Sequence, residues 1–98
     1  MRSKKKNKDN YTPTIDAELD LHGQFADGAR SLTRDFLNDS YRSGFSRVRI
    51  ITGKGNRSKD GVSVLGAVIK SYLNEQGYDY TYAKIQNGGE GALEVRLK

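Results

Sequence analysis

The first residues that could carry chemistry are a carboxylate and an imidazole in the segment Leu-Asp-Leu-His-Gly at positions 19–23. Asp20 and His22 stand two residues apart where apolar and polar residues alternate, so both side chains leave a strand on one face. A neighbouring carboxylate raises the pKa of an imidazole and fixes its tautomer, and such a histidine can move protons near neutral pH. His22 is the only histidine in the chain, and Gly23 leaves room for a substrate. The alternative is that both side chains only solvate a loop.

A second motif, Thr-Gly-Lys-Gly-Asn-Arg-Ser-Lys at positions 52–59, joins a predicted strand to a predicted helix. Glycines there expose backbone N–H groups, and the helix N-terminus adds partial positive charge, so the segment predicts a phosphate-binding loop. It matches neither the nucleotide P-loop nor the G-x-G-x-x-G pattern, and a solvated cationic loop remains the alternative. The candidate binding residues are Thr52, Gly53, Lys54, Gly55, Arg57 and Lys59.

A third glycine-rich segment, Asn-Gly-Gly-Glu-Gly at positions 87–91, precedes the last predicted strand. Gly88, Gly89 and Gly91 would let the backbone lie close to a ligand, whereas turn chemistry alone indicates a flexible hairpin loop. The six tyrosines offer stacking surfaces for unpaired bases, although tyrosines in alternation are also common in ordinary sheet packing.

The positive charge of the chain is concentrated in two segments. Seventeen Lys and Arg against 12 Asp and Glu give a net charge of +5, and residues 1–14 hold +4 of it in what we expect to be a disordered basic arm. Between residues 42 and 59 all six charged residues are basic. Proteins bind a phosphodiester backbone with clustered cations of this kind. Arg47 and Arg49 of this segment are therefore further candidates for nucleic-acid binding.

Several classes of protein are excluded by what the sequence lacks. The absence of cysteine excludes disulfides and thiolate metal sites. No apolar run reaches the roughly 18 to 20 residues of a membrane span. No apolar stretch follows the basic N-terminus as in a secretory signal. We expect a cytoplasmic monomer that does not contact membranes, with one domain at residues 15–98.

The pattern of apolar residues predicts the order βαβαββ. Strands are predicted around Ala17–His22, over Ser46–Thr52, Tyr78–Gln86 and Ala92–Lys98, and helices over Phe25–Arg42 and from Val64 to Gly77. Phe25, Ala29, Leu32, Phe36 and Leu37 are expected to form the apolar face of the first helix. With strands in sequence order, both helices cover one face of a mixed four-stranded sheet in a two-layer α/β sandwich. The other face should be polar and carry Arg47, Arg49, Glu94 and Arg96.

Together, LDLHG, TGKG and GGEGALEVRL, in this order and in this frame, resemble the Smr (small MutS-related) domain over residues 15–98. The resemblance implies a sandwich similar to the C-terminal domain of translation initiation factor three, and endonuclease activity on DNA or on messenger RNA at stalled ribosomes. The family motifs fall on Asp20-Leu21-His22, on Gly53-Lys54-Gly55 and on the late glycines. Many members carry histidine where this chain has Thr52. The chain looks like a stand-alone or an excised member.

The hypothesis from sequence is an endonuclease acting on RNA or branched DNA, in repair or in ribosome quality control. His22, oriented by Asp20, would act as general base or acid, and the glycine loop would hold a phosphate. On RNA a 2′-hydroxyl would attack without a metal, whereas on DNA water would attack, with a divalent Mg or Mn ion on Asp20. No structural metal is expected, because these two residues supply too few ligands. The alternatives are a non-catalytic nucleic-acid-binding module and an adaptor that binds a ribosome or repair protein.

Overall fold

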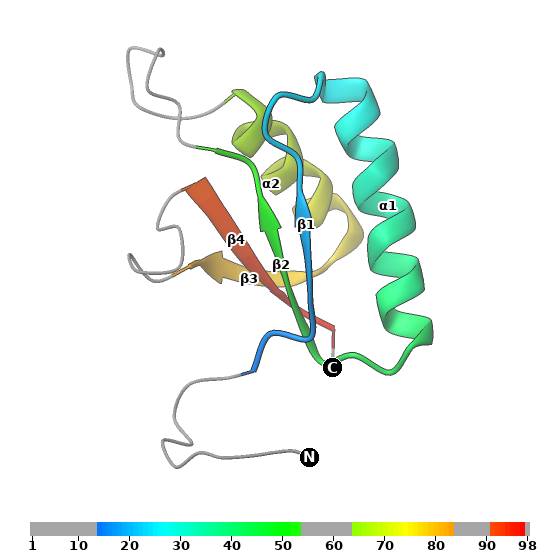
Figure 1. The fold of residues 1–98 in the computed structure, drawn as a ribbon. Helices are drawn as coiled ribbons and strands as arrows, with labels where there is room; N and C mark the ends of the chain where they lie inside the picture. Colours follow the sequence, from blue (N-terminus) through cyan, green and yellow to red (C-terminus); the bar gives the residue numbers. More distant parts are fainter. Residues whose placement is uncertain (1–13, 54–63, 84–90, 98) are drawn as a thin grey trace.

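The computed structural model describes residues 14–53, 64–83 and 91–97. Its elements are β1 (Ala17–Asp20), α1 (Ala26–Arg42), β2 (Arg47–Ile51), α2 (Val64–Gln76), β3 (Asp79–Tyr82) and β4 (Ala92–Arg96), which confirms the order βαβαββ. The sheet forms one layer and the two helices form the other, as Figure 1 shows. The predicted basic arm and most of the two glycine-rich segments lie outside the described residues.

The strand order in the sheet is β1-β2-β4-β3, so the expected arrangement in sequence order is wrong in one respect. β1 and β2 are parallel neighbours, and β4 is antiparallel, both as expected. β4 lies between β2 and β3, however, and is antiparallel to both. The physical reason is that, between β2 and β3, β4 forms backbone hydrogen bonds along both of its edges. Its apolar residues then lie in the centre of the sheet.

The core lies between the sheet and the helices. Val48, Ile50, Leu93 and Val95 point into it from the two central strands and are buried. In α1 the buried residues are Ala29, Thr33, Leu37 and Ser40, at steps of three and four. Leu65, Ile69 and Leu73 supply the buried apolar face of α2. Among the residues that the structure describes, no helix is long and apolar enough to cross a membrane.

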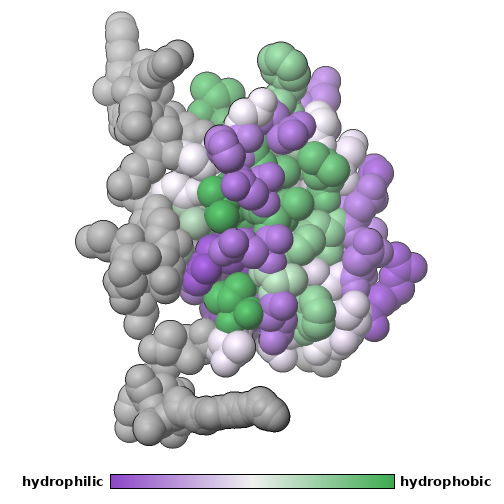
Figure 2. Space-filling view, viewed as in Figure 1, coloured by the Kyte–Doolittle hydropathy of each residue, from purple (hydrophilic) through white to green (hydrophobic). Residues whose placement is uncertain are grey.

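The predicted apolar face of α1 was partly wrong. Phe25 and Leu32 are 88% and 42% exposed, while Thr33 and Ser40 are buried in their place. Ala29, Thr33, Leu37 and Ser40 line up along one side of the helix, because residues three and four apart share a face. Figure 2 shows hydrophobic residues along the seam between β1 and α1 and hydrophilic ones on the outer side of α1.

The face of the sheet opposite the helices is charged, as predicted. Arg49 of β2 donates to Glu18 of β1 at 2.9 Å and to Glu94 of β4 at 3.0 Å. Further along, Arg96 of β4 pairs with Asp79 of β3 at 3.3 Å. Cross-strand ion pairs of this kind neutralise the face and link neighbouring strands.

Candidate active site

The three sequence motifs meet at one end of the sheet. Asp20 pairs with Ile51, which pairs with Ala92 on its other side. The backbone N–H groups of Thr52 and Gly53 both donate to the carbonyl oxygen of Gly91, each at 2.9 Å. The carboxyl ends of β1 and β2 and the start of β4 therefore form one edge, which is where open α/β sheets commonly bind ligands.

Asp20 and His22 form the contact that the sequence predicts. Oδ1 of Asp20 lies 2.6 Å from Nδ1 of His22 and also accepts the backbone N–H of His22 at 3.1 Å. This second bond fixes the carboxylate relative to the backbone that carries the imidazole. The side chains are 73% exposed for His22 and 52% for Asp20, so a substrate can reach both.

The carboxylate of Asp20 changes the pKa of the imidazole of His22. Its hydrogen bond raises the pKa of His22 above the usual 6.5, and the same bond lowers the pKa of Asp20. With Nδ1 facing Asp20, Nε2 makes no hydrogen bond with any described residue. The arrangement suits a proton carrier that is held in one tautomer and presents Nε2 outward.

Gly53 brings the glycine loop beside the imidazole. A Cβ atom built on Gly53 would lie 3.6 Å from Cβ of His22. Gly53 has φ of +85° and Gly23 has φ of +84°, a region that residues with side chains rarely adopt. The start of the loop therefore turns sharply past His22, while Lys54, Gly55, Arg57 and Lys59 lie outside the described residues.

Thr52 lies inside the protein rather than at the surface of the site. It is only 4% exposed, and its hydroxyl lies 3.5 Å from the carbonyl oxygens of both Gly53 and Gly91. The backbone of Gly91 is held by the N–H groups of Thr52 and Gly53, whereas Gly88 and Gly89 lie outside the described residues. Thr52 therefore supports the turn between β2 and the loop from inside.

The structure does not bring Arg47 and Arg49 to His22. Arg47 is the first residue of β2, at the end of the strand far from the candidate site. Arg49 lies at mid-strand on the charged face, 16% exposed between two glutamates. The basic segment read from the sequence is thus divided in space, because alternate residues of one strand spread along its length.

Sequence reasoning missed the exposure of one residue that is close to His22 along the chain. Phe25 follows His22 by three residues, precedes α1 and is 88% exposed. Periodicity assigned it to the core, and the only signal against this was its position before the first helical turn. An exposed aromatic ring is a surface on which an unpaired base can stack.

The described residues contain no group of three or more His, Asp or Glu side chains that could hold a metal ion. Asp20 and His22 together offer two donors, and Nδ1 of His22 is already engaged with the carboxylate. A divalent ion at Asp20 would need most of its ligands from water and substrate phosphate, as is usual for magnesium.

The comparisons with known proteins agree on one family. The sequence profile of the Smr domain matches residues 19–98. The chain is 45% identical over 88 residues to "Endonuclease MutS2" of Pelotomaculum thermopropionicum, covering 90% of this chain and 10% of that protein. The curated relatives that it matches are longer, and the chain spans less than half of their length.

Two solved structures share the fold and the order of elements. The Smr domain of Thermus thermophilus MutS2 superposes with a TM-score of 0.73 at 25% identity, covering 84% of this chain and 98% of that one. YdaL of Escherichia coli, a stand-alone small MutS-related protein, superposes with a TM-score of 0.74 at 28% identity, covering 83% and 63%. From the matched profile and the shared βαβαββ frame, the chain belongs to the Smr domain family.

Proposed function

We propose that this domain is a nucleic-acid endonuclease in which His22 transfers the proton during cleavage of a phosphodiester. The observation that carries the proposal is the 2.6 Å contact between Nδ1 of His22 and Oδ1 of Asp20 at the ligand-binding end of the sheet. Endonuclease MutS2, the relative with 45% identity, supports it by name. The basic residues of the glycine loop would hold the scissile phosphate.

The chemistry follows from the outward ring nitrogen. On RNA, Nε2 of His22 accepts the proton of a 2′-hydroxyl, O2′ bonds to phosphorus, and the bond from phosphorus to O5′ breaks. The products are a 2′,3′-cyclic phosphate and a 5′-hydroxyl that takes a proton from His22 or water. On DNA, Nε2 accepts a proton of water instead, the water oxygen bonds to phosphorus, and one ester bond from phosphorus to O3′ or O5′ breaks, with the leaving oxygen taking a proton from His22 or water. A divalent ion would neutralise the phosphate.

The test is cleavage of matched single-stranded, duplex and branched RNA and DNA, with and without EDTA, followed by end-group analysis. We expect His22→Ala to lower cleavage by about 10²-fold or more, the usual contribution of a positioned acid or base. Nucleic-acid affinity should change little. Gln24→Ala, an exposed residue two positions on, is the matched control and should cleave normally. Full cleavage by His22→Ala would contradict the proposal.

A second candidate is a nucleic-acid-binding module without catalysis. It is favoured by the single histidine of the chain, because a mechanism that uses a second imidazole has none available: Thr52 stands where many family members carry histidine, and it is buried. This candidate predicts binding that weakens steeply with salt, with no cleavage of any of the substrates by the unmodified protein. The same set of substrates therefore decides between the two.

A further inference from the structure

A cavity lies at the opposite end of the sheet from His22. It measures about 680 Å³, within the range of roughly 300–1,000 Å³ typical of small-molecule sites. Its walls are the C-terminal turns of both helices, the start of β3 and the end of β4. β2 spans the distance between the two ends, which for its five residues is roughly 13 Å at about 3.3 Å per residue.

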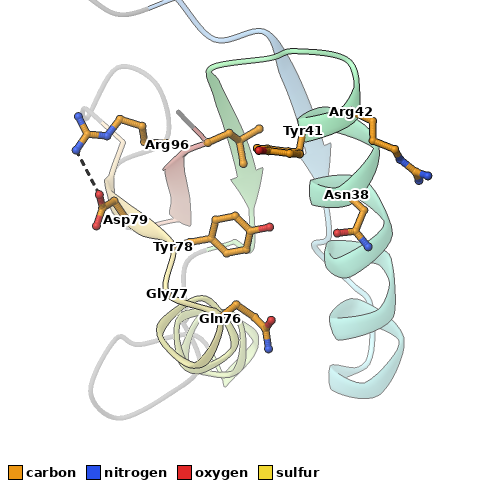
Figure 3. Close-up of a pocket in the computed structure, with 9 residues that line it drawn as sticks. Asn38, Tyr41, Arg42, Gln76, Gly77, Tyr78, Asp79 and Arg96 are labelled. Carbon is orange, nitrogen blue, oxygen red and sulfur yellow. Dashed lines mark hydrogen bonds and ion pairs between the residues drawn. The ribbon is translucent and has the colours of Figure 1, made fainter.

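Two tyrosines from different parts of the chain line this cavity. Tyr41 projects from α1 toward the sheet, and the ring of Tyr78 lies between the two helices, as Figure 3 shows. Tyr41 is 61% exposed, so a ligand can reach its ring. Burial raises the pKa of Tyr78, and the nearby phenols of Tyr72 and Tyr41 raise it further, so its hydroxyl stays protonated and can donate a hydrogen bond.

Apart from Gly77 and Leu97, the remaining wall residues are polar. Asn38 and Gln76 add carboxamides, each with a donor and an acceptor, from the last turns of α1 and α2. The guanidinium groups of Arg42 and Arg96 lie at the two outer sides of the cavity in Figure 3. Arg42 pairs with Asp39 and Arg96 with Asp79, and more than half of each arginine side chain is exposed. Such exposed ion pairs are weak, so either arginine can turn to an anionic ligand at small cost.

We propose that this cavity is a nucleotide subsite, which takes the base of an unpaired nucleotide against Tyr41 and Tyr78 and its phosphate at Arg42 or Arg96. Aromatic rings stack on any base, and carboxamides match the donor and acceptor edges of bases. The inference rests on the proposed function, since it gives the nucleic-acid substrate a second anchor. The subsite favours substrates that have an unpaired nucleotide a few nucleotides away from the scissile phosphate.

The first test uses nuclear magnetic resonance of the isotope-labelled chain. The probes are the four nucleoside 5′-monophosphates, with ribose 5-phosphate and inorganic phosphate as controls without a base. We expect the nucleotides to shift the side-chain amides of Asn38 and Gln76 and the backbone of Gly77 to Asp79, and the two controls to leave the carboxamides unshifted. Equal shifts with ribose 5-phosphate, or no shifts in this cavity, would overturn the proposal.

The second test compares two exposed tyrosines. Tyr41→Ala should weaken nucleotide binding about tenfold, within the range for loss of one base-stacking ring, and Tyr41→Phe should restore it. Tyr82→Ala is the matched control, because Tyr82 is 48% exposed on β3 and contacts Lys70 outside the cavity. Normal binding by Tyr41→Ala, or equal losses in both variants, would remove the basis for the subsite.

These tests are independent of cleavage. If the cavity binds no nucleotide but His22→Ala still abolishes cleavage, the subsite is wrong and the proposed activity stands. If nucleotides bind in the cavity of a chain that cleaves nothing, the subsite stands and the activity is wrong.

Discussion

The two ends of the sheet differ in how they are assembled. At the His22 end the central contact joins residues two positions apart, and backbone bonds from Thr52 and Gly53 to Gly91 hold the surrounding loops. The opposite end is lined by side chains from α1, α2, β3 and β4, and its ion pairs are exposed. The contact between Asp20 and His22 lies within one short segment and keeps its geometry when the helices shift slightly, whereas the tyrosine cavity depends on how both helix ends pack. Substitutions should therefore affect cleavage at the His22 end and nucleotide binding in the tyrosine cavity independently of each other.

The largest effect is expected from Asp20→Asn, which keeps the shape of the side chain but removes its charge. Asp20 is a positioning residue, and we expect cleavage to fall by about 10²-fold, the lower limit for positioned acid–base catalysis. The pKa of His22 should fall toward 6.5, because the carboxylate that raises it is gone. With His22 as general base, the rate increases with pH up to this pKa, so the midpoint of the pH profile should move to lower pH.

The single histidine makes this measurable by proton resonance during a pH titration. Nucleotide binding in the tyrosine cavity is the control and should not change. An unaltered His22 pKa with reduced cleavage would show that Asp20 acts by some route other than its charge on the imidazole.

The next effect concerns Arg49, which lies between the two ends. Arg49→Met would leave Glu94, with only 14% of its side chain exposed, without its ion-pair partner. We expect a loss of about 1–3 kcal/mol in the free energy of unfolding, measured with urea. Adding Glu94→Gln should recover part of the loss. Unchanged stability combined with weaker nucleic-acid binding would instead place Arg49 in the nucleic-acid interface that its sequence position suggested.

A matched pair of glycines offers a smaller and sharper comparison. Gly23 and Gly77 have φ of +84° and +79°, and a Cβ on either would meet nothing within 4 Å. Each substitution by alanine should cost about 1 kcal/mol of stability, because of the backbone conformation alone. We expect only Gly23→Ala to reduce cleavage and only Gly77→Ala to weaken nucleotide binding in the cavity that it lines. Loss of both functions in either variant would mean that the two ends are coupled.

The smallest effect is expected from Asp79→Asn, which breaks the exposed pair with Arg96. Stability should change by less than about 0.5 kcal/mol, as is common for exposed ion pairs. Nucleotide binding should tighten about twofold, since a screened negative charge leaves the cavity wall. Asp35→Asn, which breaks the exposed pair with Arg34 away from this cavity, is the control and should leave binding unchanged. Weaker binding by Asp79→Asn would argue against a phosphate at Arg96.

Local patterns in the sequence predicted the elements, the contact between Asp20 and His22, and the polar face of the sheet. They did not predict the neighbours of Arg49, because Glu18 and Glu94 are 31 and 45 residues away and reach it only through strand pairing. The same limit applies to the tyrosine cavity, since Tyr41 and Tyr78 have no shared motif. Phe25 was misplaced because periodicity does not show where a helix begins.

The position of β4 has a consequence for how the chain folds during synthesis. β2 and β3 run in the same direction but are joined only through β4, which comes after both of them along the chain. Until residues 92–96 leave the ribosome, β2 and β3 each keep an unpaired edge that can pair with other chains. The sheet can therefore be completed only after β4 has been synthesised. A chain released before that point would be prone to aggregate.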